Sequence, residues 1–178
     1  MFFLRKNTSI DNQFILLIIN AFFMLFFANV LTAQCRYIPK TNQMQTRSQI
    51  LVGGYTVYQT LAAKMRKSND EIFLDVHFET KETEFSIKKD ATLTLVFTDG
   101  QKVVLYAKDL LHSDAYQTCC DSVWLVEVAY LIPKKDYTLI AKNNIVEIHL
   151  ELDNRLEILN LKSKKQGKLS DLINCLSE

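Results

Sequence analysis

The sequence predicts an α+β domain that is mainly β, built on an antiparallel sheet of about six or seven strands. Apolar and polar residues alternate along several runs, and this two-residue period is typical of a strand with one buried face. Asp99-Gly100 joins two of these runs, as expected of a hairpin. An apolar stripe at helical spacing ends the sequence, so we also expect a C-terminal helix packed on the sheet.

Residues 1–33 have the pattern of a signal peptide. Two basic residues precede the apolar run FILLIINAFFMLFFANVL, whose densest part, 14–27, is 14 residues long. A bilayer span needs about 20 apolar residues, whereas the apolar region of a signal runs to about 7–15. We therefore expect cleavage after Ala33 and a periplasmic or secreted protein. The alternatives are an uncleaved membrane anchor and a lipid on Cys35.

Beyond the signal, the sequence predicts two parts. Residues 34–70 are expected to form an N-terminal arm with short elements, and residues 71–178 a β-rich domain with a C-terminal helix. The first part of the arm is polar and has no clear period. The apolar residues 50–52 precede two glycines, which predicts a short strand and a turn. Apolar residues between 57 and 65 fit both helical spacing and alternation, so the sequence leaves helix and strand open there.

From residue 72 the alternation is clean. It predicts strands at 72–79, 85–87, 93–97 and 103–106. The last two surround Asp99-Gly100, whose residues tolerate the positive φ angles of a type I′ turn. We therefore expect an antiparallel hairpin at this point.

The second half of the chain predicts further elements of both kinds. Residues 109–121 are interpreted as a loop, and 123–132 is apolar on both faces except for Glu127, which predicts an inner strand. Residues 134–143 carry apolar side chains at i, i+3 and i+4, so a short helix is expected near 134–143.

The C-terminal part alternates again before the final helix. In 145–152 we expect Val146, Ile148, Leu150 and Leu152 to face the core. Leu156, Ile158 and Leu161 predict a last strand, and Ser163 can cap the final helix. The apolar stripe of that helix consists of Leu169, Leu172, Ile173 and Leu176.

All four cysteines lie beyond the predicted signal: Cys35, Cys119, Cys120 and Cys175. An even count in an exported chain favours disulfide bonds. A bond between the neighbours Cys119 and Cys120 would strain the peptide between them, since the Cα atoms of a disulfide usually lie about 4.4–6.8 Å apart. We therefore expect Cys35 and Cys175 each to bond one member of the pair. The alternative is a thiol redox site, although C-x-x-C spacing does not occur.

The charge balance argues against a nucleic-acid partner. Two of the 21 basic residues and one of the 20 acidic residues belong to the predicted signal, which leaves 19 of each. A neutral chain lacks the basic footprint that binds phosphates. The densest basic patch has the character of a solvated helix face and comprises Lys162, Lys164, Lys165 and Lys168.

Two predicted strands each carry a histidine among acidic residues, which raises the question of a metal site. Since residues i and i+2 of a strand point the same way, His77 shares one face with acidic residues on either side, and His149 does the same on its strand. If the two strands are neighbours, these side chains can converge on a divalent ion such as Zn²⁺. The alternative is a solvated sheet face, and no other cofactor is predicted. The residues assigned to such a site are His77, His149, Asp75 and Glu147.

Three stretches of the chain resemble a group of small exported proteins common in Bacteroidota. They are FSIKKD with the LTLVFTDGQKVVL that follows it, KKDYTLIAKNNIVEIHLEL and LSDLINCL, within residues 72–178. The segment before residue 70 departs most from the group. The resemblance implies export and the final helix. Because the group has no established activity, it implies no functional residues.

We therefore expect a non-catalytic structural or partner-binding domain of the cell envelope. Its partner is a protein or another envelope component, and it contacts the membrane only through the signal segment or through a lipid on Cys35. The alternative is a metal-dependent envelope hydrolase that uses the polar strand faces around His77 and His149. No G-x-S-x-G motif or phosphate-binding loop points to other enzymes.

Overall fold

The computed structural model describes residues 35–53, 59–119 and 121–177. They belong to one compact unit, Cys35–Glu178. The predicted signal peptide and the cleavage site after Ala33 lie outside the described residues. Among those described, no helix is both long enough and apolar enough to cross a bilayer.

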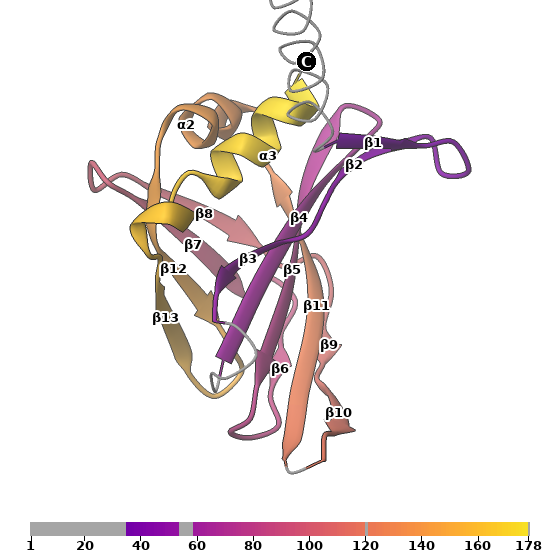
Figure 1. Ribbon diagram of the computed structural model, residues 1–178, viewed down its shortest axis with the longest axis vertical. Helices are drawn as coiled ribbons and strands as arrows, with labels where there is room; N and C mark the ends of the chain where they lie inside the picture. The colour runs from indigo at the N-terminus through magenta and orange to yellow at the C-terminus, as the bar shows by residue number, and fades with distance from the viewer. Residues whose placement is uncertain (1–34, 54–58, 120, 178) are drawn as a thin grey trace, which may run out of the picture. The chain divides into compact units, whose positions relative to one another are not determined.

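The fold is mainly β, and every strand pairing in it is antiparallel (Figure 1). The larger sheet has the order β1-β2-β4-β5-β11-β10, with β3 also beside β4. This confirms the predicted sheet of six or seven strands. Its strands are β1 (Cys35–Ile38), β2 (Gln43–Thr46), β3 (Gln49–Val52), β4 (Gln59–Ser68), β5 (Glu71–Thr80), β10 (Asp114–Gln117) and β11 (Ser122–Ile132).

A smaller sheet packs against the larger one, in the order β13-β12-β7-β8. The two sheets meet where Ala107, just beyond β8, forms a bridge with Tyr130 of β11. A short pair of strands, β6 (Ser86–Ile87) and β9 (Leu111–His112), forms a separate two-stranded sheet, and Ile87 of β6 belongs to the common core. The strands of the smaller sheet are β7 (Thr92–Phe97), β8 (Lys102–Tyr106), β12 (Ile145–Glu151) and β13 (Leu156–Asn160).

Two short helical segments pack beside each other at one end of the domain (Figure 1). The first is the turn η1 (Lys134–Asp136) followed by α2 (Tyr137–Lys142), at the position predicted for a short helix. The second is α3 (Lys168–Ser177), which packs on β4 as predicted. Its predicted apolar stripe is fully buried. Ser163 does not cap it, because Ser163 lies in a separate turn, η2 (Ser163–Lys165).

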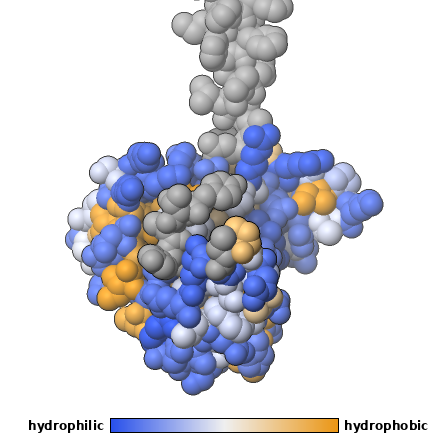
Figure 2. All heavy atoms as spheres, turned by 60° about the horizontal axis from the view of Figure 1, so that its bottom comes forward, coloured by the Kyte–Doolittle hydropathy of each residue, from blue (hydrophilic) through white to orange (hydrophobic). Residues whose placement is uncertain are grey.

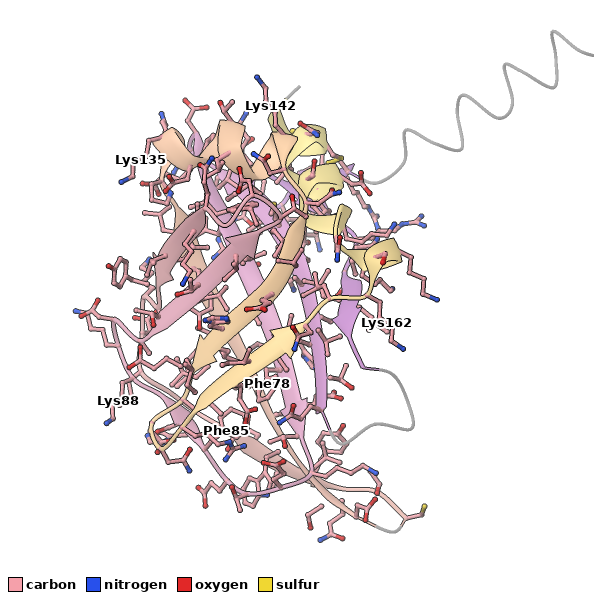
Figure 3. All side chains as sticks on the ribbon, turned by 90° about the vertical axis from the view of Figure 1, so that its left-hand side faces the viewer. Phe78, Phe85, Lys88, Lys135, Lys142 and Lys162 are labelled. Carbon is pink, nitrogen blue, oxygen red and sulfur yellow. A yellow bond between two sulfur atoms is a disulfide. The ribbon has the colours of Figure 1, made fainter. Side chains whose placement is uncertain are left out.

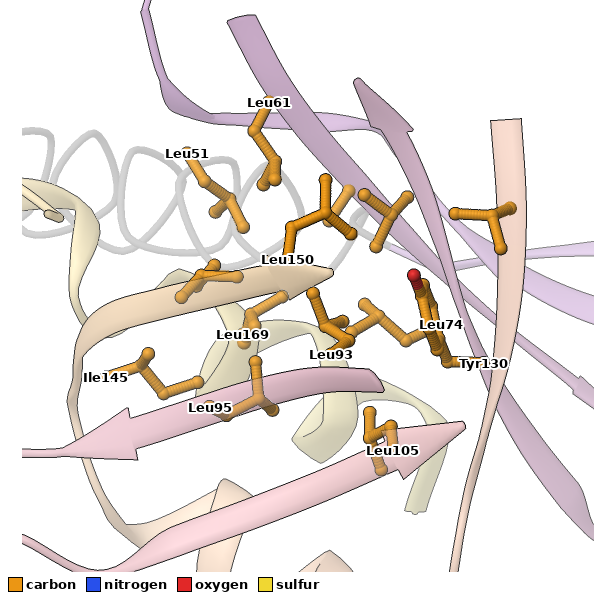
Figure 4. Close-up of a cluster of buried hydrophobic side chains, with 14 of the residues drawn as sticks. Leu51, Leu61, Leu74, Leu93, Leu95, Leu105, Tyr130, Ile145, Leu150 and Leu169 are labelled. Carbon is orange, nitrogen blue, oxygen red and sulfur yellow. The ribbon is translucent and has the colours of Figure 1, made fainter. Parts of the chain in front are cut away.

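One hydrophobic core fills the space between the two sheets and α3. Figure 4 shows Leu61 and Leu74 from the larger sheet, Leu95 and Leu150 from the smaller sheet, and Leu169 from α3. Each of them is almost wholly removed from solvent. Burying one such side chain stabilises a fold by roughly 1.5–3 kcal/mol, so this cluster dominates the stability of the domain.

The described residues of the segment 34–70, which are 35–53 and 59–70, form β1 to β4 and the turn after β4, and all four strands belong to the larger sheet. β1 and β2 form a hairpin, and the ten-residue β4 pairs along its whole length with β5. Alternation therefore prevails over helical spacing at 59–65, because it buries Leu61 and Met65 against the core. Asn69 and Asp70 both have positive φ angles and form the two-residue turn between β4 and β5, as a type I′ turn requires.

The hairpin at Asp99-Gly100 is confirmed, but its turn is of another type. Only Gly100 has a positive φ angle, of 83°. Its N–H donates to the carbonyl of Phe97 at 2.9 Å, so three residues rather than two make the loop. This is the type I turn followed by a left-handed glycine that three-residue hairpins adopt.

The two last strands are present as predicted, but the facing of some residues differs. A bulge between Ile145 and Glu147 turns Ile145 rather than Val146 into the core. Leu156 and Ile158 lie on the outward face, each 54% exposed. Leu159 and Leu161 are buried in their place.

The predicted loop at 109–121 contains two strands, β9 and β10. Cys119 follows β10 and is exposed, and Cys120 lies outside the described residues. The disulfide joins Cys35 directly to Cys175. The pairing predicted for these two cysteines, each with a member of the 119/120 pair, is therefore wrong. The physical reason is that β1 packs against α3, which brings the two ends of the domain together.

This disulfide also bears on the predicted alternatives for Cys35. A thiol that is bonded to Cys175 is not available for a lipid. The disulfide and a lipid on Cys35 exclude each other, and the lipid stays a prediction that the structure does not test. The disulfide is instead a link between the first strand of the larger sheet and the helix that covers the core.

We expect the substitution Cys175→Ser to lower the free energy of unfolding by about 3–5 kcal/mol, because the bond closes a loop with a sequence separation of 140 residues. Thermal unfolding of oxidised protein measures the change. The double variant Cys35→Ser/Cys175→Ser is the control and should match the single variant, since either change removes the same bond. An additive double variant would contradict the assigned pairing.

Tyr130 is the largest fully buried side chain of the core. Its hydroxyl oxygen lies among leucine side chains in Figure 4 and has no hydrogen-bond partner among the described residues. Burial, with a smaller effect of the Glu151 charge, raises the pKa of Tyr130 far above the ordinary value. The hydroxyl therefore remains protonated and costs desolvation energy without a compensating bond.

The substitution Tyr130→Phe should therefore raise the free energy of unfolding by about 1 kcal/mol. Denaturant unfolding gives the value. Tyr137→Phe is the matched control, because the Tyr137 hydroxyl accepts a hydrogen bond from the Ile72 N–H at 3.0 Å and its loss should destabilise. Equal destabilisation by the two changes would show that the Tyr130 hydroxyl has a partner after all.

Candidate binding groove

The outer face of the larger sheet, which points away from the core, is hollowed into a groove of about 740 Å³. Its floor includes Ala62 of β4, His77 of β5 and Glu127 of β11. Ile50 of β3 borders it beyond β4, and Tyr116 of β10 borders it beyond β11. Sites for small ligands typically measure about 300–1,000 Å³, so the groove is of a size that binds a ligand.

Strand register explains why these side chains share one face. Ala62 pairs with His77 in the β4–β5 ladder, and His77 pairs with Glu127 in the β5–β11 ladder. Paired residues of adjacent strands point to the same side of a sheet. Val76 and Phe78, the neighbours of His77 in the chain, point into the core and are buried. The same alternation therefore builds the core on one face and the groove on the other.

A network of four polar side chains crosses the groove. His77 Nε2 lies 2.8 Å from Glu79 Oε1, and His77 Nδ1 lies 3.2 Å from Glu127 Oε1. On the neighbouring hairpin, the Tyr116 phenol interacts electrostatically with the Glu79 carboxylate. Desolvation raises the pKa of Tyr116, and the interaction with Glu79 raises it further. The neutral phenol can therefore donate a hydrogen bond to Glu79.

The imidazole of His77 is held between two carboxylates. Its neutral form donates from one ring nitrogen and thus satisfies only one of them, whereas its protonated form can donate to both. The Glu127 side chain is 68% exposed, so one of these carboxylates remains open to solvent and to a ligand.

Ion pairs flank this network at both ends of the groove. Arg66 Nε lies 2.9 Å from Asp75 Oδ2, and its guanidinium stacks over the ring of Phe73 at 4.2 Å. Burial raises the pKa of Asp75, while Arg66 opposes this shift. Lys81 Nζ lies 2.7 Å from Asp121 Oδ2. Lys64, which also lines the groove, pairs with Asp75 across the β4–β5 ladder. Basic side chains therefore lie beside Asp75 and Asp121, and Glu79 and Glu127 are the other two carboxylates of the lining.

The predicted metal ligands do not converge. Asp75 and His77 share the outer face of β5, as the two-residue period predicts. Glu147 and His149 lie on β12 of the smaller sheet, where His149 Nε2 contacts Glu147 Oε2 at 2.9 Å. β5 pairs with β4 and β11, whereas β12 pairs with β7 and β13, so the two histidine strands are not neighbours. In the part of the chain that the structure describes, no group of three or more ligating side chains is arranged around an ion.

Reasoning from the sequence missed the residues that complete the groove. Tyr116 fell in a predicted loop, and Ala62 in a segment of ambiguous period. Glu127 carried the clearest signal, because it is the only charged residue of a long apolar strand. A lone carboxylate in such a strand indicates a polar partner on an adjacent strand, although the sequence does not show which one.

Comparison of the chain with protein-family models, curated proteins and solved structures finds no match. The resemblance to exported proteins of Bacteroidota therefore stays a prediction. The groove and the chemistry of its side chains are the features of the molecule that bear on function.

We expect Glu79→Gln to lower the pKa of Tyr116, because it removes the negative charge that disfavours the phenolate. The pKa should stay above the ordinary tyrosine value, since burial is the larger cause of the shift. NMR titration of protein with ¹³C-labelled tyrosine measures it. Glu82→Gln, at an exposed carboxylate of the same region, is the control and should leave Tyr116 unchanged. An unchanged Tyr116 in Glu79→Gln would rule out the network.

Proposed function

We propose that this chain is an exported, non-catalytic domain of the cell envelope that binds a partner in the groove of its larger sheet. The observation that carries the proposal is the groove itself, with the network of Tyr116, Glu79, His77 and Glu127 across it. Export is supported by the signal-like segment at 1–33 and by the disulfide, since such bonds persist in oxidising compartments.

The chemistry of the groove favours a segment with a basic side chain. Asp75 and Asp121 pair with Arg66 and Lys81. Glu79 and Glu127 lie on either side of His77, and Tyr116 also interacts with Glu79. A lysine or arginine of the partner can bond these carboxylates. Apolar neighbours of that residue can contact Ile50 and Val123, which also line the groove. The ligand class is therefore an extended peptide segment that combines basic and apolar side chains.

The face shown in Figure 2 supports a local binding site rather than a large apolar interface. On the face shown in Figure 2, hydrophobic residues form a few patches on a mostly hydrophilic surface. Large hydrophobic interfaces are typical of obligate partners, whereas separate exposed apolar residues are normal for a soluble domain. A partner that docks a short segment in the groove agrees with this surface.

The alternative of a metal-dependent hydrolase is not proposed. It required His77 and His149 to meet, and their strands belong to different sheets. In the groove, the two ring nitrogens of His77 lie within hydrogen-bond distance of the Glu79 and Glu127 carboxylates. This arrangement organises charge for recognition.

A peptide-display selection against the oxidised protein tests the proposal. We expect enrichment of extended peptides that carry Lys or Arg beside apolar residues. The variant Glu127→Lys should weaken binding of a selected peptide at least tenfold, because it reverses a charge that lies open in the groove. Isothermal titration calorimetry measures the affinity.

Glu84→Lys is the matched control, since Glu84 is exposed, lies outside the groove lining and carries the same charge. It should leave the affinity within about twofold of the original. Equal losses in the two variants would show that only net charge matters. Peptides without basic residues, or peptides insensitive to Glu127→Lys, would overturn the proposed site.

A further inference from the structure

The helical side of the domain carries a concentration of lysines. η1 and α2 contribute three, and the segment from Lys162 to Lys168 contributes four. Figure 3 shows Lys135 and Lys142 extending outward at the end that carries α2, and Lys162 at the edge of the domain nearer the middle of the view. Five of the seven are exposed and the other two half-buried. The full set is Lys134, Lys135, Lys142, Lys162, Lys164, Lys165 and Lys168, here called the helical lysines.

The balanced composition hides a charge asymmetry. Within the described residues of the helical segments 134–142 and 162–177, the seven lysines stand against two carboxylates, Asp136 and Asp171. Only Lys168 among the helical lysines has an ion pair in the described structure, with Asp171 at 3.9 Å. The rest of the described domain has 12 basic and 16 acidic residues. The helical side is therefore positive, whereas the remainder is negative.

The chain also enters the domain on this side. Cys35, the first described residue, is bonded to Cys175 of α3, and Lys67 Nζ donates to the Leu176 carbonyl nearby. The apolar run ends at Leu31, four positions before Cys35. Four residues span at most about 14 Å at about 3.3–3.6 Å each. A bilayer that holds or has just released the apolar run thus lies within reach of α3.

We propose that the helical lysines dock on the anionic lipid headgroups of the bilayer through which the chain is exported. Each lysine near an anionic surface contributes to attraction, and a cluster of four to eight is typical of proteins that bind such lipids. The proximity of the apolar run favours a bilayer over a soluble polyanion. This docking leaves the groove, on the outer face of the larger sheet, free to bind a partner, and it shares with the proposed function only the assumption of export.

Vesicle co-sedimentation of the protein processed after Ala33 tests this inference. Every member of the hydrophobic core lies between residues 51 and 176, and the disulfide joins 35 to 175, so this part contains its own core and crosslink. We expect it to sediment with vesicles that contain one-third phosphatidylglycerol and not with pure phosphatidylcholine vesicles. Raising the salt concentration should release it, because screening weakens surface charge interactions.

Two variants that lose the same number of positive charges show which surface of the domain binds the vesicles. The first replaces Lys134, Lys135, Lys142 and Lys164 by Gln and should weaken vesicle binding more than tenfold. The second replaces four exposed lysines away from the helices and should retain most binding: Lys88, Lys89, Lys102 and Lys108. Circular dichroism confirms that both variants fold.

Three results would overturn the inference. They are absence of binding to the anionic vesicles, equal loss of binding in the two variants, and binding to heparin without binding to vesicles. The last result would assign the helical lysines to a soluble polyanion. None of these results depends on the peptide that the groove binds.

Discussion

The backbone pairing of β4, β5 and β11 is the constraint on which the rest of the structure depends. The β4–β5 ladder runs over ten residues without a bulge, and β11 continues it on the other side of β5. A slip of one residue in β5 would move Val76 and Phe78 outward and His77 inward. Because the buried face is large and apolar, that exchange is strongly disfavoured. The core thus fixes the position of every side chain in the groove.

The disulfide and α3 close the core of the same unit at one end. α3 covers the core at one end, and the bond from Cys175 to Cys35 holds the first strand of the larger sheet against it. The basic helical side and the acidic groove therefore belong to different surfaces of one rigid core. Such a separation suits a domain that contacts a lipid surface with its helical lysines and binds a partner in the groove.

The sequence was sufficient to predict the elements whose signal is local. The alternation of β5 and β7 and the apolar stripe of α3 each lie within a single element. A short stretch of sequence is therefore enough to predict each of these elements. The pairing of Cys35 with Cys175 and the position of β4 were not predictable in the same way, because they depend on contacts between distant segments. The groove likewise requires knowing that Glu127 lies opposite His77, which no spacing within one strand reveals.

An NMR titration of the ¹⁵N-labelled processed protein with a selected lysine-containing peptide shows directly whether the peptide binds in the groove. We expect amide shifts to concentrate at Ala62, His77, Glu127 and the β10–β11 hairpin, while the smaller sheet and α3 remain unaffected. Shifts centred on the outward face of β12 and β13, near His149 and Ile158, would contradict it. That result would assign binding to the smaller sheet and leave the groove without a function.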